Sequence, residues 1–345
     1  MSVKPTIKEI AKLANVSIGT VDRVLHNRGD VSKKTTQLIR GIMEEINYVP
    51  NTFARNLALN KNFKIAVLLP EHEKGEYWTA PLKGAKKALK DFKALGTMVQ
   101  IYLYDQKDKN SFFEVSSRIF KDKNDAILLA QVLFDETKSF LEECKKKKVP
   151  FILIGTGQHN SGAISYIGQN SHQGGRLAGE LLSFGQNKQS KFLVLNITKA
   201  QNPNVNVKER IAGFESYFKD NKEQEFQIEV FSVPQEDKNV VQKIKEKLSS
   251  LNNLKGIFVP NSKSFILAKA LSPSHHIRIV GYDLLDKNKQ LLENKKIDFL
   301  INQRPYDQAY QGIEYLYKFL GMQQDPPQVV SLPLDIVTKE KLMYY

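Results

Sequence analysis

Hydrophobic and polar positions follow two different patterns along this chain, and the pattern changes near residue 62. Before that point, apolar residues recur at helical spacing, as Ile7, Ile10, Ala11 and Ala14 do at i, i+3, i+4 and i+7. After it, short strand-like apolar runs alternate with helical stretches. The sequence therefore predicts a small all-α region followed by a larger α/β region.

The all-α region begins with two short helices. Thr6, followed three residues later by Glu9, is a capping box for the first helix. Asn15-Val16-Ser17 interrupts the pattern, and Ser17 can cap a second helix over 18–25. Two short helices joined by a tight turn are typical of a helix-turn-helix.

The second helix has a buried face and a face that is left for a partner. Val21, Val24 and Leu25 form its apolar side. The residues left for a partner are Ile18, Gly19, Asp22, Arg23 and His26.

A third helix is expected to open at Val31 and Ser32 and to stop before Pro50, because proline cannot donate a backbone hydrogen bond. Its expected core residues are Leu38, Ile39, Ile42, Met43 and Ile46. Asn51 can cap a last short segment over 52–60. That segment has little apolar surface, so it should be only marginally helical alone.

In the rest of the chain, expected strands alternate with expected helices. The expected strands are 64–70, 98–105, 126–130, 150–155, 192–197, 226–233, 256–260 and 277–283. The expected helices are 81–95, 111–121, 135–147, 208–219, 239–250 and 264–271. Such alternation predicts doubly wound, mostly parallel sheets that bind ligands at the carboxyl ends of their strands. Because the alternation of strands and helices begins again near residue 192, we expect two lobes with a cleft between them.

Several short motifs in the first sixty residues occur together and in order. They are T-I-K-E-I-A, A-N-V-S, T-V-x-R-V-L, V-S-x-x-T, Y-V-P-N and A-R-N-L-A. This segment resembles the headpiece of the lactose-repressor (LacI/GalR-type) family of bacterial transcription regulators. A small helical bundle that binds a protein is the alternative interpretation.

The resemblance implies a multi-domain fold. An all-α helix-turn-helix headpiece (1–50) and a hinge helix with linker (51–62) would precede a two-lobed α/β, periplasmic-binding-protein-like sensor over 63–345. In this threading the first lobe holds about 63–165 and 300–322. The second lobe holds about 166–299 and 323–345.

The resemblance also implies how the headpiece reads double-stranded operator DNA. The helix 18–25 would lie in the major groove, with Ile18, Gly19 and Arg23 facing the bases. Arg23 is the candidate for guanine O6 and N7, with a phosphate clamp as the alternative. The other expected DNA contacts of the three-helix part are Thr6, Ser17, Thr20, Asp22 and His26. Asp22 departs from the serine of many relatives, and we expect it to orient Arg23.

In the family, the segment that follows folds on the operator and inserts a leucine into the minor groove. Leu57 is the matching residue, with Asn51, Ala54 and Arg55 also expected at the DNA. Packing of Leu57 between two hinge helices is compatible with that role. Because a pseudo-palindromic site needs two headpieces, we expect a homodimer.

Candidate ligand-binding residues lie at the expected strand ends. Arg210 matches a family arginine that holds ligand hydroxyls or carboxylate, and an arginine with a carboxylate and amides suits vicinal hydroxyls. The candidates are Tyr77, Trp78, Gln131, Arg210, Asn261, Asp283 and Gln303. Trp78 could equally be a core residue, and Asp283 could cap the next helix. Relatives often have an acidic residue after the fourth strand, where this chain has Gly155-Thr156-Gly157.

Composition adds limits. The net charge is +14, and residues 1–61 hold 10 of the 51 basic and 5 of the 37 acidic residues, so the headpiece is the more basic part per residue. The single cysteine, Cys144, the missing N-terminal apolar stretch and the lack of long apolar runs favour a cytoplasmic, nucleoid-associated protein. Phosphate-loop, nucleophile-elbow and zinc-protease motifs do not occur, so we expect no catalytic residue, cofactor or metal.

The sequence thus predicts a regulator of carbohydrate-utilisation genes, a repressor controlled by a sugar or sugar derivative in the cleft. Two alternatives stay open. One is a regulator whose effector is a nucleotide, a purine or a partner protein, and the other is a sugar-acting enzyme with a DNA-binding head.

Overall fold

A computed structural model gives the fold. It describes residues 5–25, 29–46, 48, 62–155, 161–187, 189–198, 204–221, 226–272 and 277–345. The chain forms two compact units, residues 1–59 and 60–345, and each is considered by itself. The expected segment 52–60 and its cap Asn51 lie outside the described residues.

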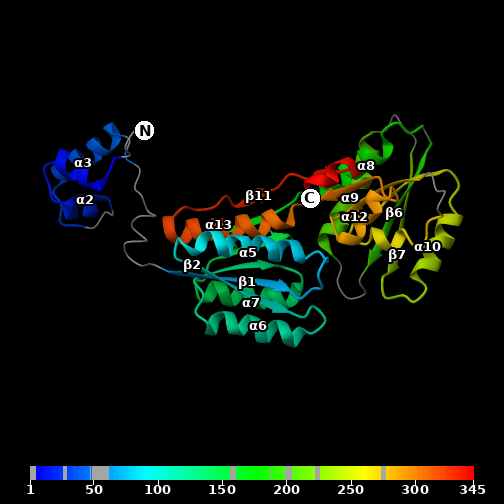
Figure 1. Ribbon diagram of the computed structural model, residues 1–345, viewed down its shortest axis with the longest axis horizontal. Helices are drawn as coiled ribbons and strands as arrows, with labels where there is room; N and C mark the ends of the chain where they lie inside the picture. The colour runs from blue at the N-terminus through cyan, green and yellow to red at the C-terminus, as the bar shows by residue number, and fades with distance from the viewer. Residues whose placement is uncertain are drawn as a thin grey trace. The chain divides into compact units, whose positions relative to one another are not determined.

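The first unit contains the three expected helices: α1 (Ile7–Leu13), α2 (Ile18–Leu25) and α3 (Lys33–Glu45) (Figure 1). The capping box is confirmed, since the Thr6 amide donates to Glu9 Oε2 at 2.6 Å and the Glu9 amide donates to Thr6 Oγ1 at 3.4 Å. Ser17 accepts from the Thr20 amide at 3.1 Å. One expected core residue is wrong: Leu38 is 51% exposed, because the buried stripe of α3 runs through Ile39 and its i+3 and i+4 neighbours.

The second unit begins with a parallel six-stranded sheet in the order β11-β5-β4-β3-β1-β2. Its strands are β1 (Phe63–Pro70), β2 (Thr97–Tyr104), β3 (Ala126–Ala130), β4 (Phe151–Gly155), β5 (Ser165–Gly168) and β11 (Val329–Ser331). Helices α5 (Thr79–Lys93) and α13 (Pro305–Met322) pack on one face. Helices α6 (Lys109–Lys121) and α7 (Phe134–Lys146) pack on the other, as Figure 1 shows. This sheet and its four helices are the first lobe.

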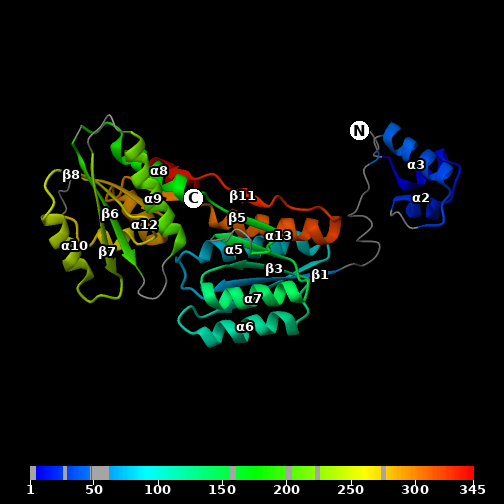
Figure 2. The same ribbon diagram turned by 180° about the vertical axis from the view of Figure 1, so that it is seen from behind.

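A second six-stranded sheet has the order β12-β10-β9-β8-β6-β7. Its strands are β6 (Lys191–Thr198), β7 (Gln227–Pro234), β8 (Leu254–Phe258), β9 (Arg278–Tyr282), β10 (Phe299–Asn302) and β12 (Asp335–Val337). Around it lie α8 (Ser171–Ser183), α9 (Val205–Asp220), α10 (Val240–Ser249), α11 (Ser264–Leu267), α12 (Asp286–Glu293) and the 3-10 helix η1 (Lys339–Tyr344). Helices α8 and α9 cover one face, and α10, α11 and α12 cover the other (Figure 2). These elements are the second lobe.

Three short segments connect the lobes, and their positions correct the expected threading. The first crossing (169–170) joins β5 to α8, the second (303–304) joins β10 to α13, and the third (332–334) joins β11 to β12. The strand at 299–302 therefore belongs to the second lobe, and 166–168 and 329–331 belong to the first. Strand pairing decides this: β10 pairs with β9 and β12, whereas β11 pairs with β5.

Candidate functional site

In the headpiece, α2 presents the expected face. Ile18, Gly19 and Arg23 are exposed, whereas Val21 and Val24 are buried against α1 and α3. A Cβ at Gly19 would meet only Ser17 Oγ, at 3.7 Å, so packing does not require glycine at this position.

Three of the side chains that are expected to contact DNA, those of Thr6, Ser17 and Thr20, make capping contacts. The hydroxyls of Ser17 and Thr20 lie 2.9 Å apart, and Thr6 Oγ1 donates to Glu9 Oε2 at 3.1 Å. Asp22 is half-buried. His26, Asn51, Ala54, Arg55 and Leu57 lie outside the described residues, so their expected roles remain predictions.

In the second unit, three of the predicted ligand residues meet: Asp283 and Gln303 directly follow β9 and β10, and Arg210 lies on α9. Gln303 Nε2 donates to Asp283 Oδ1 at 2.7 Å, and Gln303 Oε1 accepts from Arg210 Nη2 at 3.3 Å. All three side chains are buried. The amide thus stands between a cation and an anion and hydrogen-bonds to both.

Arg210 is held by aromatic and backbone groups. Its guanidinium lies 3.7 Å from the centre of the Tyr282 ring, and Nη1 donates to the Pro260 carbonyl at 2.8 Å. Gln169, with its amide oxygen turned towards Arg210, accepts from Nε at 3.2 Å. These contacts leave the guanidinium few alternative positions.

Asp283 has an unusual backbone and an unusual charge environment. Its φ of 67° lies in the left-handed region, and Asn288 Nδ2 steadies it by donating to the Asp283 carbonyl at 3.2 Å. Burial raises the pKa of the Asp283 carboxyl, and Arg210 and the hydrogen bond from Gln303 oppose that shift only in part. The alternative role of Asp283 as a cap is wrong, because α12 has Leu285 at its N-cap and no side-chain cap.

Tyr77 approaches this group from the first lobe. Burial and then the charge of Asp283 raise the pKa of the Tyr77 hydroxyl, and Arg210 lowers it. A Cβ added at Gly155 would lie 4.0 Å from that hydroxyl. Arg210, Asp283, Gln303 and Tyr77 are called the interlobe cluster below.

The lobes also touch at the Gly155 carbonyl. It accepts from Tyr166 at 2.9 Å within the first lobe and from Asn206 Nδ2 of the second lobe at 3.2 Å. Burial raises the pKa of Tyr166 to about 12, so this phenol stays a donor at neutral pH. At Gly155 itself φ is 76°.

Two other candidates, Asn261 and Gln131, have no contact with the interlobe cluster in the described part of the chain, and a third, Trp78, contacts it through the Tyr77 ring. Trp78 packs against the core of the first lobe and meets the Tyr77 ring edge-on at 4.8 Å. The side-chain amide of Asn261 bonds to nearby backbone groups: it donates to the Ile197 carbonyl at 2.9 Å and accepts from the Lys263 amide at 3.1 Å. Gln131 is buried, and its Oε1 has no hydrogen-bond partner among the described residues.

Sequence reasoning missed several members of this region. They are Tyr166, Gln169, Asn206, Tyr282 and Asn288. Asn206 could have been found, because it precedes Arg210 by four residues on α9 and therefore shares its face. Tyr166 and Gln169 belong to β5 and the crossing after it, and a four-residue strand leaves little periodic signal.

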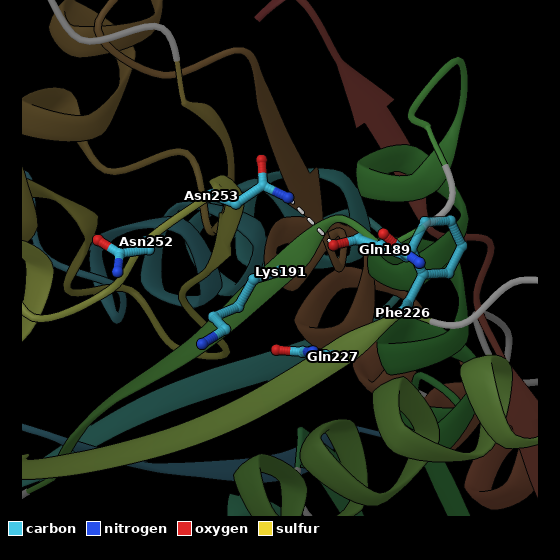
Figure 3. A pocket seen from close by; sticks show the side chains of 6 residues that line it. All are labelled: Gln189, Lys191, Phe226, Gln227, Asn252 and Asn253. Atoms are coloured by element: carbon cyan, nitrogen blue, oxygen red, sulfur yellow. Dashed lines mark hydrogen bonds between the residues drawn. The ribbon is translucent and has the colours of Figure 1, made fainter.

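A hollow lies elsewhere, at the amino ends of β6, β7 and β8 (Figure 3). It measures about 640 Å³ and is lined by Gln189, Lys191, Phe226, Gln227, Asn252 and Asn253. These residues sit at the opposite ends of the strands from the interlobe cluster. Where the chain is described, no group of three or more His, Cys, Asp or Glu residues could hold a metal ion, and no helix is long and apolar enough to cross a membrane.

Comparison with known proteins agrees with both units. Residues 6–51 match the bacterial regulatory proteins of the lacI family, and residues 65–324 match the periplasmic binding protein domain. The ribose operon repressor of Lactococcus lactis is 24% identical over 98% of each chain. The transcriptional regulator DegA of Bacillus subtilis is 32% identical over 44% of each chain, so that match spans less than half of either protein.

A solved structure supports the same assignment. A candidate LacI transcriptional regulator from Bacteroides fragilis superposes with a TM-score of 0.76 and 25% identity, covering 83% of this chain and 100% of that one. The helix-turn-helix, the two-lobed sheets and these matches together lead to one assignment. The chain belongs to the LacI family of bacterial regulatory proteins, with a sensor of the periplasmic-binding-protein fold.

Proposed function

We propose that this regulator binds a pseudo-palindromic operator as a homodimer and represses carbohydrate-utilisation genes under the control of a neutral sugar. The observation that carries the ligand part is the interlobe cluster, in which one buried cation and one buried anion are bridged by an amide. Such a donor and acceptor set suits vicinal hydroxyls, which can donate to a carboxylate and accept from a guanidinium.

The charge of the cluster argues for a neutral ligand. Arg210 and Asp283 compensate each other, and Tyr77 and Gln303 are uncharged. A phosphate or carboxylate ligand would add a second buried anion beside Asp283, which costs free energy unless another cation pairs with it. The similarity to a ribose operon repressor over nearly the whole chain also favours a sugar.

For the DNA part, we propose that α2 enters the major groove and that Arg23 reads a guanine. The exposed face of α2, which carries Ile18, Gly19 and Arg23, supports this role. Leu57 would insert between base pairs in the minor groove, with Ala54 and Arg55 beside it. Two headpieces are needed for two half-sites, hence the homodimer.

A ligand panel tests the sugar assignment. Thermal unfolding of the full chain is measured with neutral pentoses and hexoses, sugar phosphates, uronic acids and purines at equal concentrations. A ligand present at ~100 times its Kd adds about 2.7 kcal/mol to the free energy of unfolding. We expect stabilisation by a neutral sugar. If only a phosphate, an acid or a purine stabilises the protein, the sugar assignment falls.

The same panel then tests regulation. An operator selected from random DNA is bound with and without the stabilising sugar, and the dependence on protein concentration gives the stoichiometry. A monomer bound to a single half-site would overturn the homodimer. An unchanged operator affinity in the presence of the sugar would overturn its role as effector, since coupling must be reciprocal.

A further inference from the structure

Two of the three crossings between the lobes are joined by an ion pair. Arg304, at the end of the second crossing, donates from Nη2 to Asp335 Oδ1 at 2.9 Å and from Nε to Oδ2 at 3.1 Å. Asp335 is the first residue of β12, directly after the third crossing. The pair therefore ties the N-cap of α13, a helix of the first lobe, to a strand of the second lobe.

The carboxylate of Asp335 is built into this position. Its side chain is 10% exposed, and it also accepts from Asn302 Nδ2 at 3.3 Å and from the Tyr345 hydroxyl. Burial would raise the pKa of Asp335, but the hydrogen bonds from Arg304 and Tyr345 outweigh it and hold the pKa below its usual range. The Arg304 side chain is 39% exposed, so the pair is only partly buried, but its charge-assisted bidentate bonds give it a defined geometry.

The second crossing also touches the interlobe cluster. Gln303, next to Arg304 in the chain, bonds to Asp283 and Arg210 through its side chain. Its carbonyl accepts from Gln308 Nε2 of α13 at 2.7 Å. Arg304 has a φ of 53°, in the left-handed region, where a non-glycine residue is held by its surroundings. Two adjacent residues thus serve the ligand-facing cluster and the ion pair.

We propose that the Arg304–Asp335 pair is a latch that forms when the lobes close and that couples the occupancy of the interlobe cluster to the angle between the lobes. Rotation of one lobe against the other moves the start of α13 relative to β12 and so acts directly on this pair, which joins the two elements. The described arrangement has the latch made and the lobes in contact through Asn206 and Gly155. The ligand part of this inference rests on the proposed function, whereas the latch itself does not.

The test measures closure without any ligand. Spin labels are placed on the exposed positions Glu114→Cys in α6 and Lys245→Cys in α10, and pulsed electron resonance gives the distance between the lobes. The native Cys144 is fully buried and should not be labelled. Asp335→Asn keeps the shape of the side chain and removes its charge. The matched control, Glu314→Gln, removes a partly exposed ion pair with Lys318 that lies within α13.

We expect Asp335→Asn to move the ligand-free distance distribution towards longer distances and Glu314→Gln to leave it unchanged. The closed-to-open ratio should fall by an amount within the roughly 5- to 150-fold range of typical couplings. Arg304→Lys, which keeps the charge but loses the bidentate geometry, should give a smaller shift in the same direction. It also provides a second variant if Asp335→Asn does not fold.

Unchanged distributions in folded Asp335→Asn or Arg304→Lys would overturn the latch. Because no effector is added, a failure of the sugar assignment leaves this result intact. Conversely, a confirmed latch together with no stabilising sugar would overturn only the proposed ligand.

Discussion

Gln303 and Asp283 are joined by a 2.7 Å hydrogen bond from amide to carboxylate, and this bond links the crossing at 303–304 to the end of β9. Asp283 is buried, and Gln303 keeps it apart from Arg210 while bonding to both. A carboxylate that is buried in this way lowers the stability of the folded protein, and it can accept hydrogen bonds from an effector. The two effects can be separated by substitution.

Asp283→Asn should stabilise the ligand-free protein at neutral pH and weaken effector binding. The pKa of Asp283 is raised on folding, so the stability that this group contributes is present below the unfolded pKa of about 3.9 and is lost as the pH rises through the folded pKa. The variant should therefore gain stability over the wild type as the pH rises. Loss of a hydrogen bond to a charged group should weaken sugar binding by about 1.5–3 kcal/mol.

Thermal unfolding of both proteins across acid to neutral pH measures the first effect, and calorimetry measures the second. Asp325→Asn, at an exposed position, is the matched control and should change neither. A wild type that stays as stable as Asp283→Asn at every pH would contradict the raised pKa.

How far the sequence could predict this molecule depends on the range of the signals. Helices α1, α2 and α3 were predictable because caps such as Thr6 and stripes such as that through Ile10 are local. Leu38 was misplaced because it stands one residue beside the stripe, where an exposed leucine looks the same in the sequence as a buried one.

The lobe threading was harder, because strand partners are set by contacts between residues far apart in the chain. Nothing in the residues 299–302 tells which sheet they join, and pairing with β9 and β12 decides it. Arg210, Asp283 and Gln303 could be named from strand ends and family likeness. Their bridging arrangement, and the ion pair of Arg304 with Asp335, depend on tertiary structure alone.

Arg23→Lys tests whether the headpiece reads a base through Arg23. Lysine keeps the charge but cannot form the bidentate bond to guanine, so operator affinity should fall by about 1–3 kcal/mol. Affinity for random DNA and the salt dependence of binding should stay the same, because the charge is retained. Equal binding of the operator by both proteins would make Arg23 a phosphate contact.

Gly19→Ala tests whether the lack of a side chain at this position of α2 is needed for DNA recognition. Because its Cβ would meet only Ser17 Oγ at 3.7 Å, the substitution should stabilise the headpiece by about 0.5–1 kcal/mol through helix propensity. If α2 approaches the bases closely here, operator affinity should fall although stability rises. Thermal unfolding measures the stability of the headpiece, and titration measures its affinity for the operator. A rise in both stability and operator affinity would place Gly19 away from the bases.

Leu57→Ala tests the proposed minor-groove wedge, whose residue lies outside the described part of the chain. Removal of the side chain should weaken operator binding much more than binding to random DNA, because only the specific complex would be kinked by insertion. Both affinities are measured at the same salt concentration. Equal losses on the two DNAs would remove the wedge from the mechanism.

Tyr77→Phe tests whether the first lobe contributes a hydrogen bond to the effector. The Tyr77 hydroxyl has no hydrogen-bond partner among the described residues, and the raised pKa keeps it protonated and able to donate at neutral pH. Phenylalanine preserves the ring that meets Trp78 edge-on. Ligand-free stability should therefore stay within about 0.5 kcal/mol of the wild type, as for substitutions that remove no contact. Sugar affinity should fall by about 0.5–1.5 kcal/mol.

Trp78, the single tryptophan, gives a fluorescence signal for the titration. If Tyr77→Phe binds the sugar as tightly as the wild type, the hydroxyl faces the ligand without bonding to it, and Asp283 and Arg210 must supply the recognition alone.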